Sequence, residues 1–204
     1  MATIKNIIFD LGGVLLNIDY LLTAKAFKGL GIAEFEELYS QFTANELFEK
    51  FETGMISEEA FYHSLHQYRT PPLSPQEIEI AWNAMLLDFR KETLDFLTRL
   101  KNKYKLYLLS NTNIIHLRGM ERILLSQTGL PSLQGYFIKS YYSHLINRRK
   151  PYPDTYKFVL NDGNMKAEET LFIDDSIHNI EGAREAGLLV HYLLPGERIE
   201  ELGL

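Results

Sequence analysis

Hydrophobic residues follow two different patterns in two regions of this chain. Between about residues 20 and 88 they recur every three or four positions, which predicts amphipathic helices, and we predict no strand there. In the remainder, short apolar runs alternate with helical patterns, which is typical of a parallel sheet. Strands are predicted at 6–9, 106–109, 136–140, 171–173 and 188–193, and helices at 94–104, from about 113, after 153 and up to 187.

This order of elements predicts an α/β fold with a doubly wound, Rossmann-like parallel sheet core. An all-helical segment interrupts the core after its first strand. We assign residues 1–15 and 89–204 to the core and residues 16–88 to the helical insertion. Ligands of doubly wound sheets bind beyond the carboxyl ends of the strands. The residues that follow each predicted strand are therefore the candidates for chemistry.

Composition narrows the class of protein. The 204 residues are 46% hydrophobic, which is enough for a core that needs no disulfide, and Cys is absent, which excludes a thiolate nucleophile. The net charge of -6 argues against nucleic acid or an anionic membrane as a partner. The apolar run that starts at Ile7 ends at Asp10, too early for a signal peptide or a membrane span. We expect a cytoplasmic protein of unknown oligomeric state.

Polar residues follow the first two strands of the predicted core. Asp10 ends the first strand and is followed by Gly12 and Gly13, so it is either a turn residue or a carboxylate at the site. Ser110 and Asn111 follow the second strand where a helix begins. Such residues are most often N-caps, but free amides at a helix start also bind phosphate.

Charged residues stand near the later strands. Lys150 precedes Pro151 in a basic loop, where it is either solvated or available to a phosphate or a carboxylate cluster. Asp174 and Asp175 end another strand. Their mutual repulsion favours a bound cation.

The order and spacing of these motifs resemble the haloacid dehalogenase (HAD) superfamily, whose members are mostly phosphatases. The matching residues are Asp10 with the following Leu-Gly-Gly-Val, then Ser110, Lys150 and the Asp174-Asp175 pair with Asn179 downstream. The helical insertion resembles the mobile C1-type cap of that superfamily. The most similar branches are bacterial α-D-glucose-1-phosphate phosphatases and the phosphatase domain of soluble epoxide hydrolase.

The resemblance implies a role for each of these residues. Asp10 would be the nucleophile that forms an aspartyl-phosphate, and Mg²⁺ would be bound by Asp10, the carbonyl of Gly12 and Asp175. Lys150 would offset the negative charge and, with Ser110 and Asn111, bind the phosphoryl oxygens. Asp174 would orient Lys150. Asp174 and Asn179 would hold the other site residues in place without contacting the substrate.

Gly12 departs from the family pattern. Most phosphatases of the superfamily have a second Asp there, which acts as general acid and base. Its absence leads to the hypothesis that the leaving group is already acidic, as the anomeric oxygen of a sugar 1-phosphate is. Asp19 and His178 are candidate substitutes, although a helix cap and a surface residue are the favoured interpretations of these two.

The favoured function is therefore a Mg²⁺-dependent phosphatase that hydrolyses a small phosphorylated metabolite, expected to be a sugar phosphate. Two alternatives remain open. A hydrolytic 2-haloacid dehalogenase also lacks the second Asp, but it needs no metal and typically has an aromatic residue at that position. A catalytically weak, phosphate-binding regulatory protein is the other alternative, and Gly12 is its main support.

Overall fold

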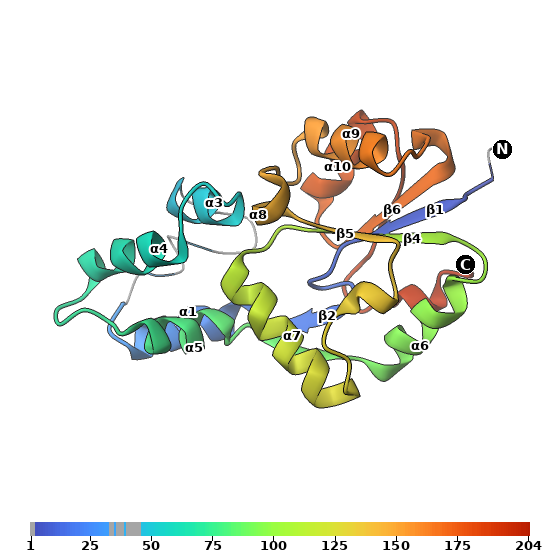
Figure 1. Ribbon diagram of the computed structural model, residues 1–204. Helices are drawn as coiled ribbons and strands as arrows, with labels where there is room; N and C mark the ends of the chain where they lie inside the picture. Colours follow the sequence, from blue (N-terminus) through green and yellow to red (C-terminus); the bar gives the residue numbers. More distant parts are fainter. Residues whose placement is uncertain (1–2, 33–34, 36–38, 40–45) are drawn as a thin grey trace.

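The computed structural model describes residues 3–32, 35, 39 and 46–204. Its centre is a five-stranded sheet in the order β5-β4-β1-β6-β7, and every neighbouring pair is parallel (Figure 1). The strands are β1 (Asn6–Phe9), β4 (Lys105–Ser110), β5 (Lys139–Tyr142), β6 (Thr170–Asp174) and β7 (Leu189–Tyr192). The predicted parallel sheet is confirmed.

Helices cover both faces of this sheet. Successive residues of a strand point to opposite faces, and in the central strands the residues on both faces are apolar. In β1, Ile7 and Phe9 pack with side chains of α6 and α7, whereas Ile8 packs with α9 and α10 on the other face. This two-sided burial is typical of parallel sheets and confirms the doubly wound, Rossmann-like fold. The helices are α6 (Lys91–Leu100), α7 (Ile114–Thr128), α8 (Ser143–Ile146), α9 (Pro153–Asp162) and α10 (Ile177–Glu185).

A second group of helices lies beside the sheet and is called the helical layer here (Figure 1). It comprises α1 (Tyr20–Gly29), α3 (Glu46–Glu52), α4 (Glu58–Leu65) and α5 (Pro75–Asn83). Ser57 and Ser74 cap the starts of α4 and α5, and Ser74 forms a capping box with Glu77. The layer encloses its own apolar cluster around the buried Trp82.

Aromatic residues recur at helical spacing in this layer, and Phe48, Phe51, Phe61 and Trp82 are each buried in its core. A further aromatic residue of that pattern, Phe42, lies outside the described residues.

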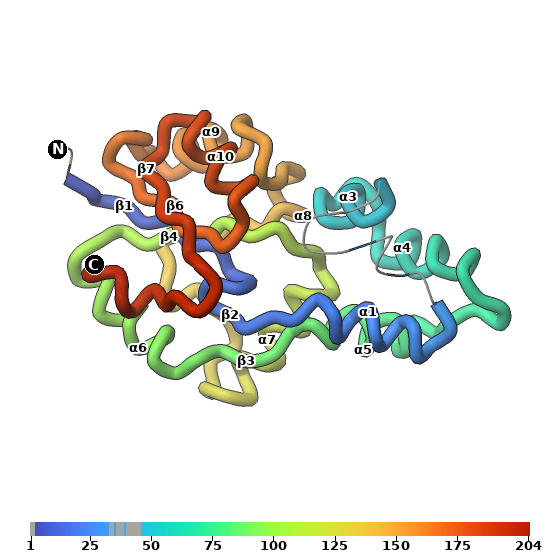
Figure 2. The backbone as a smooth tube through the Cα atoms, turned by 180° about the vertical axis from the view of Figure 1, so that it is seen from behind, coloured from blue at the N-terminus to red at the C-terminus, as the bar shows by residue number. Residues whose placement is uncertain are grey.

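The prediction that residues 20–88 contain no strand is wrong. β2 (Leu16–Ile18) and β3 (Leu86–Phe89) pair antiparallel and connect the helical layer to the sheet (Figure 2). Both strands are short, and three of the four residues of β3 are partly or fully exposed, so neither forms a long apolar run.

Boundaries differ elsewhere as well. The strand predicted from residue 136 begins at Lys139, at an edge of the sheet, where one neighbour alone defines the pairing.

Among the residues that the structure describes, no helix has the length and apolar character needed to cross a membrane. Single 3₁₀ turns span His66–Tyr68, Leu133–Gly135, Ala167–Glu169 and Ile199–Glu201.

Candidate active site

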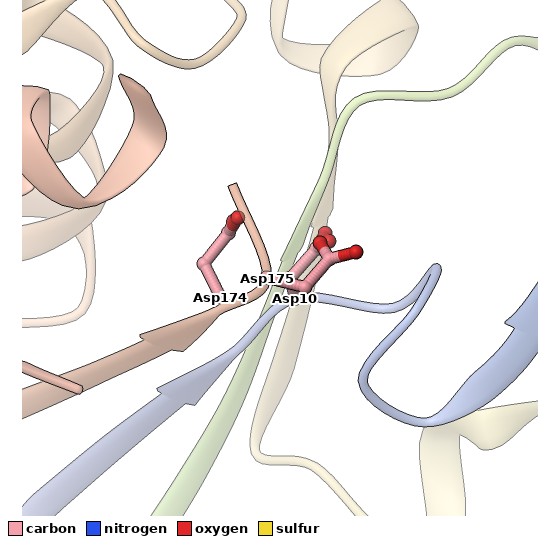
Figure 3. A group of neighbouring side chains, drawn as sticks. All are labelled: Asp10, Asp174 and Asp175. Atoms are coloured by element: carbon pink, nitrogen blue, oxygen red, sulfur yellow. The ribbon is translucent and has the colours of Figure 1, made fainter. Parts of the chain in front are cut away.

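Three carboxylates meet where β1 and β6 end. These strands are neighbours with Phe9 opposite Ile173, so Asp10, which follows β1, lies beside Asp174, which ends β6, and Asp175 comes next. The backbone N–H of Asp10 donates to the Ile173 carbonyl at 2.9 Å. One oxygen of each of the three aspartates lies within 4.8 Å of the others. Figure 3 shows the three side chains at the ends of the two strands.

Lys150 supplies a positive charge to this group. Its side chain is buried, and its Nζ lies 2.6 Å from Asp10 Oδ1 and 2.6 Å from Asp174 Oδ2. Burial alone would lower the pKa of Lys150, but the two adjacent carboxylates outweigh it and raise that pKa above its ordinary value. Lys150 is therefore an ammonium ion at neutral pH.

The backbone of Lys150 is fixed by the side chain of Asn111. Asn111 Nδ2 donates to the Lys150 carbonyl at 2.9 Å, and the Lys150 N–H donates to Asn111 Oδ1 at 2.9 Å. Because Asn111 follows β4, this exchange joins the end of that strand to the basic loop. Sequence reasoning expected the Asn111 backbone to serve phosphate and missed this use of its side chain.

Asp174 is fully buried and engaged on both oxygens. Besides Lys150, it accepts from Asn179 Nδ2 at 3.0 and 3.1 Å and from the Ser176 N–H at 2.8 Å. A carboxylate held in this way orients Lys150 and has little capacity left for a metal ion. Asp10 and Asp175 are therefore the better candidates for metal ligands.

Burial and the neighbouring carboxylates favour the protonated forms of Asp10 and Asp175. Burial raises the pKa of Asp10 to about 7; Lys150 opposes this shift, and the neighbouring aspartates add to it. Burial, followed by repulsion from Asp174, raises the pKa of Asp175 to about 6. A hard divalent cation such as Mg²⁺ prefers carboxylate and carbonyl oxygens. The donor set at this edge fits such an ion, which would stabilise both ionised carboxylates.

Gly13 allows the backbone to approach Asp175 closely. Its φ of +78° lies in the left-handed region, and a Cβ at this position would lie 2.2 Å from Asp175 Oδ2. Glycine at position 13 is therefore required by the left-handed backbone of the turn and by the space that the Asp175 carboxylate occupies.

Ser110 ends β4 and is buried beside a small pocket. The pocket lies between the sheet and the helical layer, and its lining includes Gly12, Ser110, Asn111, Tyr20 and Tyr39. The N-cap of α7 is Asn113, whose Oδ1 accepts from the N–H groups of Ile115 and His116. Ser110 and Asn111 precede this cap and are not part of it.

The structure thus brings the predicted site residues together at one edge of the sheet: Asp10, Gly12, Ser110, Asn111, Lys150, Asp174, Asp175 and Asn179. The two candidate substitutes for a general acid follow their favoured interpretations. Asp19 caps α1 by accepting from the Leu21 N–H at 2.9 Å, and His178 is exposed on α10.

Comparison with known proteins shows which family the chain belongs to. Residues 4–187 match the family model of the haloacid dehalogenase-like hydrolases. The chain is 33% identical over 184 residues to a D-ribitol-5-phosphate phosphatase from Bacteroides thetaiotaomicron, covering 90% of this chain and 89% of that protein.

Solved structures with the same fold include a HAD family enzyme from Bacteroides thetaiotaomicron in complex with magnesium and inorganic phosphate. It has a TM-score of 0.86 and 34% identity, covering 98% of this chain and 100% of that one. A predicted HAD-like hydrolase from Porphyromonas gingivalis has a TM-score of 0.85 and 35% identity, covering 96% and 94%. The chain described here belongs to the haloacid dehalogenase-like hydrolase family.

Proposed function

We propose that this protein is a Mg²⁺-dependent phosphatase that hydrolyses a small sugar or polyol phosphate through an aspartyl-phosphate on Asp10. The observation that carries the proposal is the position of Lys150 Nζ, 2.6 Å from both Asp10 and Asp174. These two carboxylates form one cluster with that of Asp175. The similarity to a D-ribitol-5-phosphate phosphatase supports a substrate of this class.

The residues that would hold Mg²⁺ are Asp10, the backbone carbonyl of Gly12 and Asp175. When bound, the ion offsets the negative charge of the carboxylates and of the phosphate. Lys150 contributes a second positive charge at the same place and, with Ser110 and Asn111, would bind the phosphoryl oxygens.

Asp10 is the proposed nucleophile. In the first step, one of its oxygens forms a bond to phosphorus while the bond from phosphorus to the alcohol oxygen breaks, and the alkoxide takes a proton from water. In the second step, the oxygen of a water molecule forms a bond to phosphorus while the bond from phosphorus to the Asp10 oxygen breaks, which releases inorganic phosphate and restores the carboxylate. The proton lost by this water neutralises the hydroxide that the first step leaves. Dividing the hydrolysis into two displacements lowers the barrier of each.

The leaving group is the point at which two substrate types differ. Gly12 provides no general acid, and this favours an acidic leaving oxygen such as the anomeric oxygen of a sugar 1-phosphate. The phosphate in D-ribitol 5-phosphate, named for the relative, is instead an ester of a primary alcohol. Both types belong in the first assay.

The helical layer is proposed to be a cap over this site. The cap would comprise residues 16–88, and the hydrolase core residues 1–15 and 89–204. Tyr20 and Tyr39 of the layer line the pocket that also contains Ser110, so the layer would cover the leaving-group side of the substrate and limit access of water.

The test is release of inorganic phosphate from D-ribitol 5-phosphate, a hexose 6-phosphate and a hexose 1-phosphate, with Mg²⁺ and with a chelator. We expect turnover of at least one substrate, loss on chelation and loss of at least about 10³-fold in Asp10→Asn. Asp154→Asn, which changes an exposed carboxylate on α9, is the control and should keep wild-type activity. Turnover retained in Asp10→Asn would overturn the mechanism.

A further inference from the structure

Helix α3 of the helical layer ends on the loop that carries Lys150. Glu52, at the end of α3, is 4% exposed, and its Oε2 lies 3.3 Å from Arg149 Nη2. Tyr39 OH donates to the other carboxylate oxygen at 3.1 Å. Burial raises the pKa of Glu52 and Arg149 opposes that shift, so the buried carboxylate depends on its arginine partner.

Two further contacts hold the same segments together. Asn147 Nδ2 donates to the Thr53 carbonyl at 2.8 Å. Gly54 has a φ of +68°, and a Cβ there would lie 2.2 Å from the His144 carbonyl oxygen. The backbone after α3 therefore packs directly against the segment between β5 and Lys150.

The loop itself is anchored by the core. Besides the exchange with Asn111, Thr155 Oγ1 donates to the Arg149 carbonyl at 2.7 Å. Pro151 packs so closely on α10 that a Cβ on Gly182 would lie 1.9 Å from its carbonyl oxygen. These contacts hold the backbone of Arg149 to the core. If the two side chains separate, it is therefore Glu52 on α3 that moves.

The opposite edge of the helical layer contacts the core differently. Trp82 of α5 stacks on His116 of α7 with ring centroids 4.6 Å apart, and its Nε1 donates to Asn113 Oδ1 at 3.3 Å. Ile115 of α7 belongs to the apolar cluster of the layer. Separating these surfaces would expose buried apolar area, whereas separating α3 from Arg149 breaks mainly polar contacts.

The pocket between the two edges is smaller than a sugar phosphate requires. A separate cavity of about 390 Å³, lined by Gly13 and Asp175, includes no residue of the helical layer. The pocket beside Ser110 and Tyr39 has a volume of about 50 Å³, whereas pockets for small ligands span roughly 300–1,000 Å³. Admission of a sugar phosphate to the Ser110 side of the site therefore requires part of the helical layer to move away from the sheet.

We propose that Glu52 and Arg149 are positioning residues that hold the α3 side of the helical layer closed over the substrate. The layer opens at this pair, while the Trp82–His116 contact stays joined. This inference rests on the proposed phosphatase function. The pair affects how the helical layer encloses the substrate, and it does not affect the attack of Asp10 on phosphorus.

The test compares Glu52→Gln, Arg149→Met and the double variant. With the best sugar or polyol phosphate, we expect KM to rise about tenfold in each single variant and no further in the double variant, because the two residues act as a pair. With acetyl phosphate, whose acetate leaving group is small, KM should change less than about threefold. Arg149→Lys, which keeps the charge, should recover most of the loss.

Arg148→Met is the matched control, since Arg148 is the preceding residue and pairs with the exposed Asp154 at 2.8 Å. Its kinetics should equal those of the wild type. An equal loss on both substrates in Glu52→Gln, or the same loss in Arg148→Met, would overturn the proposed role.

Hydrogen exchange gives a readout that does not need activity. Backbone amides of residues 46–54 should exchange about tenfold faster in Glu52→Gln than in the wild type, because local opening becomes easier. Backbone amides of α7 beside the Trp82–His116 contact should exchange at the wild-type rate. Unchanged exchange of residues 46–54 would overturn the inference. A wild type that hydrolyses no phosphate ester would instead refute the proposed function, and the exchange experiment would still decide on the pair.

Discussion

The Cδ1 atom of Ile18 occupies the space in which a side chain at position 12 would begin, since a Cβ placed on Gly12 would lie 2.9 Å from it. The backbone at Gly12 lies outside the left-handed region, so an L residue can adopt its conformation. The obstacle to a side chain there is the end of one flexible isoleucine in β2. Position 12, where the resemblance to the phosphatases of the superfamily places a general acid, is thus closed by packing, and a small shift of Ile18 would open it.

We predict that Gly12→Asp gains activity on esters of primary alcohols. A carboxyl group at this position can protonate the departing oxygen, which is worth about 10²-fold in kcat when the leaving group is poor. Displacing Ile18 should lower the free energy of unfolding by about 1–2 kcal/mol. The measurement is kcat for a hexose 6-phosphate and a hexose 1-phosphate.

Gly12→Ala is the control, because it makes the same contact with Ile18 without adding an acid. It should lose similar stability and gain no activity. An equal gain in both variants, or a gain confined to the hexose 1-phosphate, would refute a general-acid role for the new carboxylate.

Burial explains which strands could be predicted from the sequence. The apolar runs that contain Ile8, Leu108 and Phe172 are continuous because both faces of the central strands are covered by helices. β3 escaped prediction because its exposed Leu87 and partly buried Asp88 interrupt the apolar signal. Its pairing with β2 also joins residues about seventy positions apart, which no local pattern records.

The position of a residue relative to the strands decides which site residues could be predicted. Asp10, Lys150 and Asp174 could be named because each follows a strand or stands on a connecting loop, and parallel strands bring such positions together. Glu52 lies within a helical pattern, where a glutamate is ordinarily solvated. Its burial against Arg149 depends on how the helical layer packs on the core. That packing is a tertiary property, and the spacing of residues along the chain does not encode it.

Asn179→Ala should weaken the support of Asp174. Asn179 Nδ2 donates to both oxygens of that buried carboxylate, and its removal leaves a charged acceptor short of a donor. We expect a loss of about 1–3 kcal/mol in the free energy of unfolding and a fall of about tenfold in kcat, because Lys150 is then less well oriented. Urea unfolding and phosphate release measure the two effects. Asn161→Ala, at an exposed position of α9, should change neither quantity.

Gly13→Ala should weaken metal binding through Asp175. The new Cβ would lie 2.2 Å from Asp175 Oδ2, so the carboxylate must move away from the site. We predict that the Mg²⁺ concentration for half-maximal activity rises about 10–100-fold. Titration of activity with Mg²⁺ tests this.

Gly196→Ala separates backbone strain from the collision with Asp175. Gly196 also has a positive φ, +85°, but an added Cβ there meets nothing within 4 Å. Both variants should lose about 1–2 kcal/mol of stability from the left-handed backbone conformation. The Mg²⁺ requirement should change in Gly13→Ala alone, and an equal change in both would contradict this account of Gly13.

His116 should make the stability of the protein depend on pH. Its Nε2 lies 3.0 Å from the Trp82 carbonyl and its Nδ1 lies 3.2 Å from Asn113 Nδ2. Asn113 Oδ1 already accepts from two backbone N–H groups, so Asn113 Nδ2 is the donor and Nδ1 the acceptor. Protonation of Nδ1 would place two donors against each other. Burial lowers the pKa of His116 from its usual 6.5 to about 4.

The sign of the effect follows from this lowered pKa. Between about pH 6.5 and pH 4 the unfolded chain binds a proton at His116 that the folded chain does not, so the free energy of unfolding falls as the pH falls. The contribution is fully present above pH 6.5. Between pH 7 and pH 5 the wild type should lose about 2 kcal/mol more than His116→Gln, as measured by urea unfolding at both pH values. His178→Gln, which changes an exposed histidine, should behave like the wild type, and an identical pH dependence in His116→Gln would show that His116 is not the group responsible.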